Sequence, residues 1–264
     1  MARSTRRPHR GRHVAFLALA ATLIGCGGAQ DAPQAATVAQ DTRSPAPGTT
    51  QARPGSTAAG AAASASPSVP TRLPGLGPRT LAEIPENARQ VVIATGADRK
   101  SPRSQVVLYR RTPMGWEPGA TWPAHNALKG WTDNHHADDL RSPIGVFALT
   151  DAGGRLADPG TELPYDRSQG FTIGGTGFEG EPLAGSFDYV VAINYNRQAG
   201  TSPLDWTRPL GAEKGGGIWL HVDHGGPTHG CVSLARNNIR ELLRALDPDQ
   251  HPVIVMGDAQ SLGR

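Results

Sequence analysis

The chain has 264 residues, a length that allows one domain of ordinary size or two small ones. Of its residues, 38% are hydrophobic and only 5% aromatic. Its formal net charge of +3 includes five arginines in the first 25 residues, where there is no acidic residue, and without them the net charge is −2. The remaining chain therefore lacks the clustered basic charge that nucleic-acid binding requires, and we expect no nucleic-acid partner.

Residues 1–25 have the parts of an export signal: an arginine-rich start, an apolar run over 14–24, and small residues at the end. The run is too short to remain in a bilayer as a spanning helix. The segment Leu23–Cys26 resembles a bacterial lipobox, which implies that 1–25 is a lipoprotein signal peptide and that Cys26 is lipidated. The alternative is an ordinary secretory signal with an incidental cysteine. We expect an extracytoplasmic protein, lipid-anchored to a bacterial membrane and facing the cell wall.

Residues 26–80 form the next segment, which is dominated by Ala, Pro, Gly, Thr and Ser and has no aromatic residue. Such a composition cannot bury enough apolar surface to offset the entropy lost on ordering. We therefore expect 26–80 to be a disordered linker that tethers one globular domain, residues 81–264, and we expect a monomer.

Short apolar runs separated by Gly, Pro and Asn predict strands in the domain. The predicted strands are Gln90–Thr95, Gln105–Tyr109, Gly145–Leu149, Tyr189–Ile193, Gly217–Val222 and Val253–Met256. The segment 150–186 is rich in Gly and Pro, and no order of elements is predicted there.

One helix is predicted from apolar residues at helical spacing. These are Ile239, Leu242, Leu243 and Leu246. Asn237 or Asn238 is the expected cap at its start, and Pro248 lies beyond its end. The predicted fold class is therefore mainly β with one main α-helix.

Cys231 is the one cysteine left if Cys26 carries lipid. Exported proteins normally pair their cysteines, so an unpaired thiol outside the cytoplasm indicates chemistry rather than chance. The alternative is a cysteine that serves as a small hydrophobic residue in the core.

The residues around Cys231 suit acyl transfer. The run Ile218–His221 is typical of a strand that carries His221 at its end, and Gly230 immediately precedes the thiol. In this hypothesis Cys231 attacks a carbonyl as thiolate and His221 takes its proton. Gly230 lets the backbone turn tightly, so that the N–H groups of Gly230 and Cys231 can hold the oxyanion.

Three motifs, which follow one another along the chain in the family's order, resemble the L,D-transpeptidase catalytic domain (YkuD) family of peptidoglycan enzymes. They are the strand ending in His221, the Thr-His-Gly-Cys-Val segment 228–232, and the Ser-Pro-Ile-Gly-Val-Phe segment 142–147. The resemblance covers most of residues 90–258 and implies a β-sandwich-like fold with Cys231 as nucleophile and His221 as base. It implies that peptidoglycan stem peptides are the partners and that a thioester forms at the third stem residue, usually a diamino acid. A second stem then takes the acyl group, and we expect no cofactor and no metal.

Some residues depart from the family pattern. Ser233 stands two places after Cys231, where a basic or amide residue is usual, and Arg236 is a candidate for the missing carboxylate contact. The side chain of Val222 cannot orient the imidazole of His221, which leaves a backbone carbonyl or Asp223 for that role.

Two further histidines have weaker claims on the chemistry. His224 precedes a glycine, as the family's base often does, and is the alternative base. Strand periodicity favours His221, which we place at the mouth of the sheet with His224 past the turn. We expect His229 to shape the turn rather than move protons.

Other classes of function are also consistent with this chemistry. His221, His224, His229 and Cys231 include zinc-type donors, but their spacing matches neither a zinc ribbon nor a helical His-Glu-x-x-His motif. The His-His-Ala-Asp-Asp segment 135–139 is more typical of a polar loop near a cleft than of a metal site. An L,D-carboxypeptidase of the same fold, a zinc-dependent cell-wall hydrolase and a non-catalytic wall-binding lipoprotein remain the alternatives.

Overall fold

The structure is a computed structural model that describes residues 69–264. The predicted signal peptide, Cys26 and most of the predicted linker lie outside the described residues. Leu73 is only 3% exposed and packs with Val91 and Trp116, and helix α1 spans Pro78–Glu83. Ordered packing therefore begins before residue 81, where composition placed the start of the domain.

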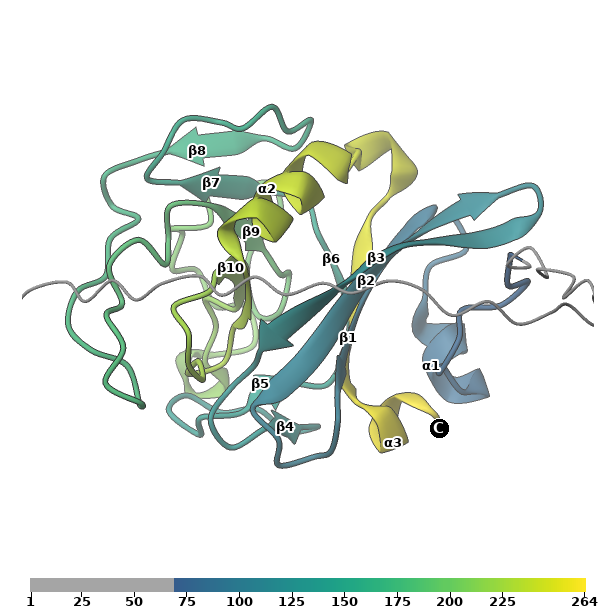
Figure 1. The fold of residues 1–264 in the computed structure, drawn as a ribbon, viewed down its shortest axis with the longest axis horizontal. Helices are drawn as coiled ribbons and strands as arrows, with labels where there is room; N and C mark the ends of the chain where they lie inside the picture. The colour runs from purple at the N-terminus through teal and green to yellow at the C-terminus, as the bar shows by residue number, and fades with distance from the viewer. Residues whose placement is uncertain (1–68) are drawn as a thin grey trace, which may run out of the picture. The chain divides into compact units, whose positions relative to one another are not determined.

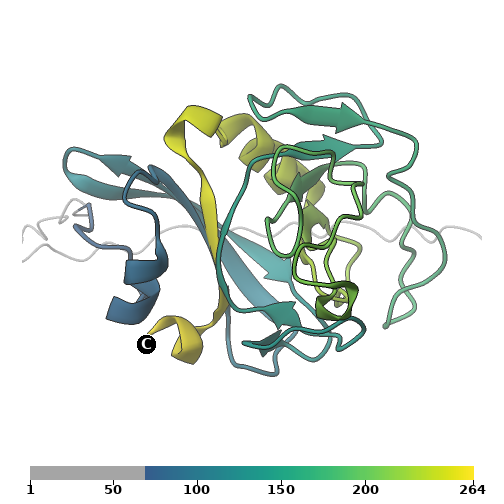
Figure 2. The same ribbon diagram turned by 180° about the vertical axis from the view of Figure 1, so that it is seen from behind.

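A curled ten-stranded sheet dominates the fold (Figures 1 and 2). In spatial order its strands are β6 (Gly145–Ala148), β12 (Val253–Asp258), β1 (Gln90–Gly96), β2 (Arg103–Thr112), β3 (Gly115–His125), β11 (Val232–Leu234), β10 (Trp219–Val222), β9 (Val190–Ala192), β7 (Ala152–Gly154) and β8 (Tyr165–Arg167). A second, two-stranded sheet pairs β4 (Trp131–Thr132) with β5 (Ser142–Pro143). All six predicted strands are present, and the mainly β fold class with one main helix is confirmed.

Helix α2 (Arg236–Ala245) packs its apolar stripe into the main core, where strands from both halves of the curled sheet meet. Ile239, Leu242 and Leu243 are fully buried, as their spacing predicts. The predicted caps are wrong: the helix begins at Arg236 after Ala235, which offers no side-chain hydrogen bond, so Asn237 and Asn238 lie inside its first turn. The tertiary position of the preceding strand β11 sets the start of the helix instead.

The other helical segments are short. They are η1 (Ala212–Lys214), η2 (Pro248–Gln250) and α3 (Ala259–Leu262). Pro248 begins η2 just after α2 has ended, as its expected place beyond the helix requires. Among residues 69–264, no helix is long and apolar enough to cross a membrane.

Strands β10 and β11 lie side by side and parallel, with Leu220 opposite Val232 and His221 opposite Ser233. Antiparallel partners flank both strands, β9 beside β10 and β3 beside β11. The connection over residues 223–231 contains no helix, and it can be this short because the two strands have only four and three residues. This arrangement brings the end of that connection, which carries Cys231, back beside the start of β10.

Candidate active site

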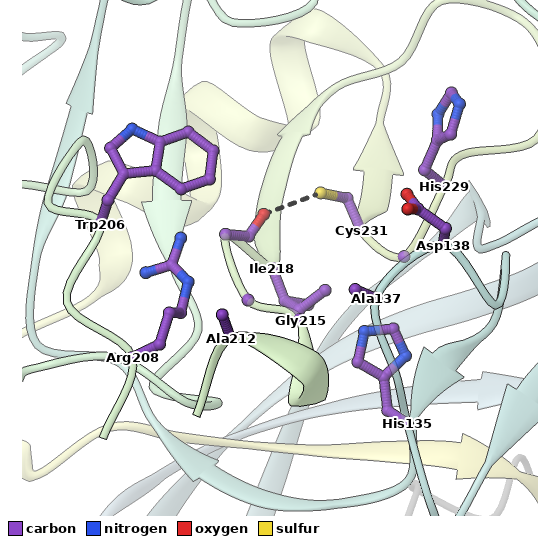
Figure 3. A pocket seen from close by; sticks show the side chains of 13 residues that line it. His135, Ala137, Asp138, Trp206, Arg208, Ala212, Gly215, Ile218, His229 and Cys231 are labelled. Carbon is purple, nitrogen blue, oxygen red and sulfur yellow. Dashed lines mark hydrogen bonds between the residues drawn. The ribbon is translucent and has the colours of Figure 1, made fainter. Parts of the chain in front are cut away.

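Cys231 is a free, half-buried cysteine that lines a pocket of about 390 Å³ (Figure 3). Four segments form the wall, contributing His135, Ala137 and Asp138; Trp206 and Arg208; Ala212 with residues 215–218; and the turn 229–231. The nucleophile candidate is therefore accessible from a concave site, which is where ligand binding is expected.

The Cys231 sulfur contacts the backbone that precedes β10. It accepts a hydrogen bond from the Trp219 N–H at 3.4 Å, and its S–H points to the Gly217 carbonyl at 3.5 Å (Figure 3). Burial raises the pKa of the Cys231 thiol to about 11, and the Trp219 N–H opposes this only in part. The thiolate expected from the sequence is therefore not the resting form, because the sulfur is packed among protein atoms and has no imidazole partner.

His221 is only 3% exposed and is covered by the edge of Phe187, whose ring centre lies 5.4 Å away. The expectation that it stands at the mouth of the sheet is wrong, since it is the third residue of β10 and lies within the sheet. Its Nδ1 lies 2.9 Å from the Val222 carbonyl, so in the neutral ring Nδ1 carries the proton and Nε2 is the basic nitrogen. Burial lowers the pKa of His221 to about 4, which makes the ring neutral at neutral pH.

Cys231 and His221 lie on the same face of the sheet. Trp219 and His221 share that face by strand alternation, and the parallel register places Cys231 beside Trp219 and Ser233 beside His221. Leu220, on the opposite face, is buried in the main core. The structure thus brings the two residues to neighbouring positions, although no hydrogen bond joins their side chains.

The turn before Cys231 is held rigidly. The Thr228 hydroxyl donates to the Cys231 carbonyl at 2.6 Å, and a Cβ at Gly230 would stand only 2.8 Å from Ile218 Cδ1. Close packing against Ile218, rather than a positive φ, therefore favours glycine at 230. Within residues 69–264 the N–H groups of Gly230 and Cys231 donate to no carbonyl, so both are free for an incoming oxygen. His229 is exposed, and its ring lies 4.7 Å from that of Phe178.

Like His221, His224 does not line the pocket. Its Nδ1 is 3.1 Å from a carboxylate oxygen of Glu181, and its ring stacks on His221 with the ring centres 5.9 Å apart. The zinc-type donors His221, His224, His229 and Cys231 thus each have separate contacts. In the part of the chain that the structure describes, no three His, Cys, Asp or Glu side chains are arranged to hold a metal ion.

Asp223 binds other partners than His221. It accepts hydrogen bonds from His125 Nδ1 at 2.9 Å and from the Ser233 hydroxyl at 2.7 Å. Burial opposes its ionisation, but these bonds outweigh burial and lower the pKa of Asp223 to about 2. Arg236 forms an ion pair with Asp188 at 2.6 Å and does not line the pocket, so the suggested carboxylate contact is not made there.

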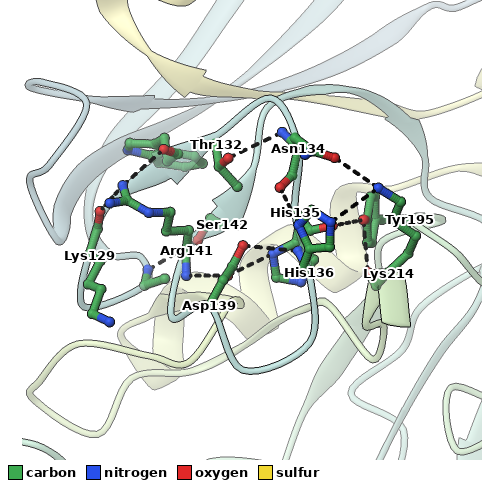
Figure 4. Close-up of polar contacts among 12 residues, drawn as sticks. Lys129, Thr132, Asn134, His135, His136, Asp139, Arg141, Ser142, Tyr195 and Lys214 are labelled. Carbon is green, nitrogen blue, oxygen red and sulfur yellow. Dashed lines mark hydrogen bonds and ion pairs between the residues drawn. The ribbon is translucent and has the colours of Figure 1, made fainter. Parts of the chain in front are cut away.

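The polar loop between β4 and β5 forms one wall of the pocket, as its composition predicts (Figure 4). The Asp139 carboxylate accepts from the backbone N–H groups of His136 at 3.0 Å and Arg141 at 2.8 Å. The Tyr195 hydroxyl lies between the loop and η1, 2.9 Å from the Lys214 carbonyl and 3.3 Å from the His135 carbonyl, and its one proton can be donated to either.

Sequence reasoning missed Arg208 and Trp206, which lie far from Cys231 along the chain yet line the same pocket. The available signal was the run of three glycines over 215–217, since such a run indicates close approach of another group to the backbone. A Cβ at Gly216 would lie 2.3 Å from Arg208 Nε, so this close approach is realised by the arginine.

Comparison with known proteins identifies a family and several similar solved structures, including one from Bdellovibrio bacteriovorus and one from Campylobacter jejuni. A model of the L,D-transpeptidase catalytic domain family, YkuD, matches residues 81–255. The chain is similar to Bd1075 from Bdellovibrio bacteriovorus, at 14% identity and a TM-score of 0.34, over 64% of this chain and 47% of that one. It is also similar to the helical cell shape determining protein Pgp2 from Campylobacter jejuni, at 15% identity and a TM-score of 0.38, over 66% and 52%. The chain spans about half the length of these two proteins, and no curated protein sequence matches it.

The buried thiol leads to a pH prediction. Because the pKa of Cys231 is about 11, its reaction with iodoacetamide should accelerate about tenfold per pH unit from pH 7 and still be rising at pH 10. The measurement is the alkylation rate of the Cys26→Ala protein, followed by intact mass. The same protein unfolded in urea is the control, and its rate should level off above about pH 8.5. A folded protein that levels off near pH 8 would contradict the burial argument.

Proposed function

Because the chain belongs to the L,D-transpeptidase catalytic domain (YkuD) family, we propose that it is a cysteine-dependent acyltransferase acting on peptidoglycan stem peptides. Cys231 attacks the carbonyl of the third stem residue and forms a thioester, and an amine of a second stem then takes the acyl group. The observation that carries the proposal is the free Cys231 thiol, which lines a pocket next to two N–H groups without carbonyl partners.

In the acylation step the thiol must lose its proton as the carbon–sulfur bond forms, because a pKa of about 11 leaves little thiolate at neutral pH. The Cys231 side chain turns from the Gly217 carbonyl toward His221, which lies on the same face of the sheet. His221 Nε2 accepts the proton and passes it to the departing amine of the fourth residue. The N–H groups of Gly230 and Cys231 hold the developing oxyanion.

In the second step the amine of another stem attacks the thioester. It gives a proton to His221, and the sulfur recovers a proton as the carbon–sulfur bond breaks. If water replaces the amine, the same site releases the shortened stem, which is the carboxypeptidase reaction. The acceptor that reaches the pocket therefore decides between cross-linking and trimming.

We also propose that the protein acts from a membrane, with Cys26 lipidated and the chain between it and the folded domain as its tether. The support is the lipobox-like Leu23–Cys26 and the absence of aromatic residues from the tether. A domain held in this way would meet the cell wall, where its proposed substrate lies.

The nucleophile is tested by Cys231→Ser. An oxygen nucleophile is far harder to ionise than sulfur, so release of the fourth residue from a tetrapeptide stem should fall below detection while the unfolding temperature stays close to that of the wild type. By resemblance to the family, a carbapenem should add its mass to the wild type and not to this variant. Mass spectrometry of peptide products and intact protein measures both. Wild-type turnover by Cys231→Ser would end the thiol mechanism.

The base is tested by replacing the two stacked histidines separately. His221→Ala should slow acylation by at least about 10²-fold, with His224→Ala costing far less, since general bases contribute roughly 10²–10⁴-fold. Because His221 acts when unprotonated and its pKa is about 4, the wild-type rate should rise as pH increases through about 4, and His221→Gln should lose that rise. The rates are measured as the time course of acylation by a carbapenem in samples quenched at successive times. A larger loss in His224→Ala would transfer the role to that residue.

The anchor is tested by Cys26→Ala in cells. This change removes the thiol that would carry lipid, so the protein should move from the membrane fraction to the soluble extracytoplasmic fraction and lose the mass of its acyl chains. Fractionation and intact mass measure the result, with Cys231→Ala as the matched cysteine control that should stay at the membrane. Unchanged processing and fractionation of Cys26→Ala would show that the protein is not a lipoprotein.

A further inference from the structure

The pocket beside Cys231 carries two opposite charges on different segments, Arg208 and Asp138. Figure 3 shows them on opposite sides, with the Cys231 sulfur between them. Neither forms an ion pair with another residue within 69–264. Charged groups that flank a nucleophile without a protein partner are candidates for substrate recognition.

Arg208 is held in place by backbone carbonyls and an aromatic ring, and the nearby Asp205 acts on its charge without forming an ion pair. Its Nη1 donates to the carbonyls of Asp205 at 3.1 Å and Thr207 at 3.0 Å, and its guanidinium lies 4.8 Å from the ring centre of Trp206. Partial burial lowers the pKa of Arg208. By contrast, the buried Arg197 pairs with Asp151 at 2.8 Å. Because no carboxylate forms an ion pair with Arg208 within residues 69–264, an anionic ligand can form a charge-assisted hydrogen bond with its guanidinium.

The free edge of Arg208 lies against the backbone that supports the nucleophile. Its Nε would be 2.3 Å from a Cβ at Gly216, and its Nη2 would be 3.7 Å from a Cβ at Gly217. The carbonyl of the same Gly217 is the group to which the Cys231 thiol points, at 3.5 Å. The guanidinium and the Cys231 sulfur thus both lie near Gly217, so Arg208 can bind a group close to the reacting carbonyl.

Asp138 is presented to the other side of the pocket by a fixed loop. It has a positive φ of 62°, is exposed, and its carboxylate accepts no hydrogen bond among the described residues. The neighbouring Ala137 N–H donates to the Glu213 carbonyl at 3.0 Å, and the Asp139 carboxylate closes the loop as Figure 4 shows. The loop therefore holds the Asp138 carboxylate toward the pocket while leaving it free to bind a cation.

We infer that Arg208 binds a carboxylate and Asp138 an ammonium of the same acyl donor, one on each side of the carbonyl that Cys231 attacks. This inference rests on the proposed function for the identity of that donor. In a tetrapeptide stem the free carboxylate of the fourth residue lies two bonds beyond the amide nitrogen that leaves. The side-chain ammonium of a third-position diamino acid lies on the acyl side. The pocket thus selects stems that end at the fourth residue and carry a basic third residue.

The same carboxylate chemistry has a second possible source, the side-chain carboxylate of a diamino dicarboxylic third residue. Matched stems separate the two. One pair has lysine at position three with the fourth residue as free acid or as amide, and a second pair replaces lysine with a diamino dicarboxylic acid. A further stem replaces lysine with norleucine, which has the same length and no charge. Binding is measured by calorimetry in the Cys231→Ala background, so that it does not depend on turnover.

In this background, amidation of the fourth residue should weaken binding about 10- to 100-fold, a typical effect of losing a charge-assisted hydrogen bond. Arg208→Gln should weaken binding of the free acid by the same factor and abolish the difference between acid and amide. Asp138→Asn, whose asparagine tolerates the positive φ, should weaken binding of the lysine stem by the same factor and abolish the difference between lysine and norleucine stems. Arg155→Gln, an exposed arginine outside the pocket, is the matched control and should keep both differences.

Three outcomes would overturn the inference: an Arg208→Gln protein that still prefers the acid by the wild-type factor, an Asp138→Asn protein that still prefers lysine, or no preference in the parent. If Arg208→Gln instead affects only stems with a diamino dicarboxylic residue, the terminal-carboxylate assignment is wrong. The proposed reaction is judged separately, by release of the fourth residue from the same stems with Cys231 intact. Discrimination without release would retain the subsite and reject the acyl transfer.

Discussion

The parallel register of β10 and β11 is the constraint on which the candidate site depends. Leu220 and Val232 face each other across it and are both fully buried in the main core. Side chains alternate along a strand, so burying this pair sends Trp219, His221 and Cys231 to the opposite face together. A slip of one residue in either strand would turn the thiol or the imidazole into the core. The same apolar contacts that stabilise the sheet therefore keep the two reactive groups on one face.

Burial acts in opposite directions on the two groups and leaves both uncharged. It raises the pKa of Cys231 to about 11 and lowers that of His221 to about 4, since in each case the charged form is the one disfavoured. Because both groups are neutral, the resting site avoids the desolvation cost of an ion pair between the Cys231 thiolate and the His221 imidazolium beside Phe187. In the proposed reaction, charge separates only when a substrate carbonyl is present to react with the sulfur and the N–H groups of Gly230 and Cys231 hold its oxygen.

Close approach of side chains to glycine backbone shapes the pocket and positions Arg208 in it. The absence of a Cβ at Gly216 and Gly217 admits the guanidinium of Arg208, and the absence of one at Gly230 admits Ile218. Within residues 69–264 the buried Arg197 pairs with Asp151, whereas the partly buried Arg141 and Arg240 resemble Arg208 in forming no ion pair. Arg208 differs from these two arginines in lining the pocket of Cys231.

The sequence by itself determined the elements and motifs that are contained in one stretch of chain. Six strands and α2 follow from apolar runs and periodicity. The expectation of a tight turn that presents the Cys231 thiol follows from its immediate neighbours. Strand β3 escaped prediction because Pro118, Gly119 and Pro123 interrupt its pattern, and only pairing with β2 and β11 makes it a strand. Only the tertiary structure decided that His221 is buried and that Arg208 reaches the pocket. Both outcomes depend on packing between segments distant in the chain, and no local spacing of residues encodes that packing.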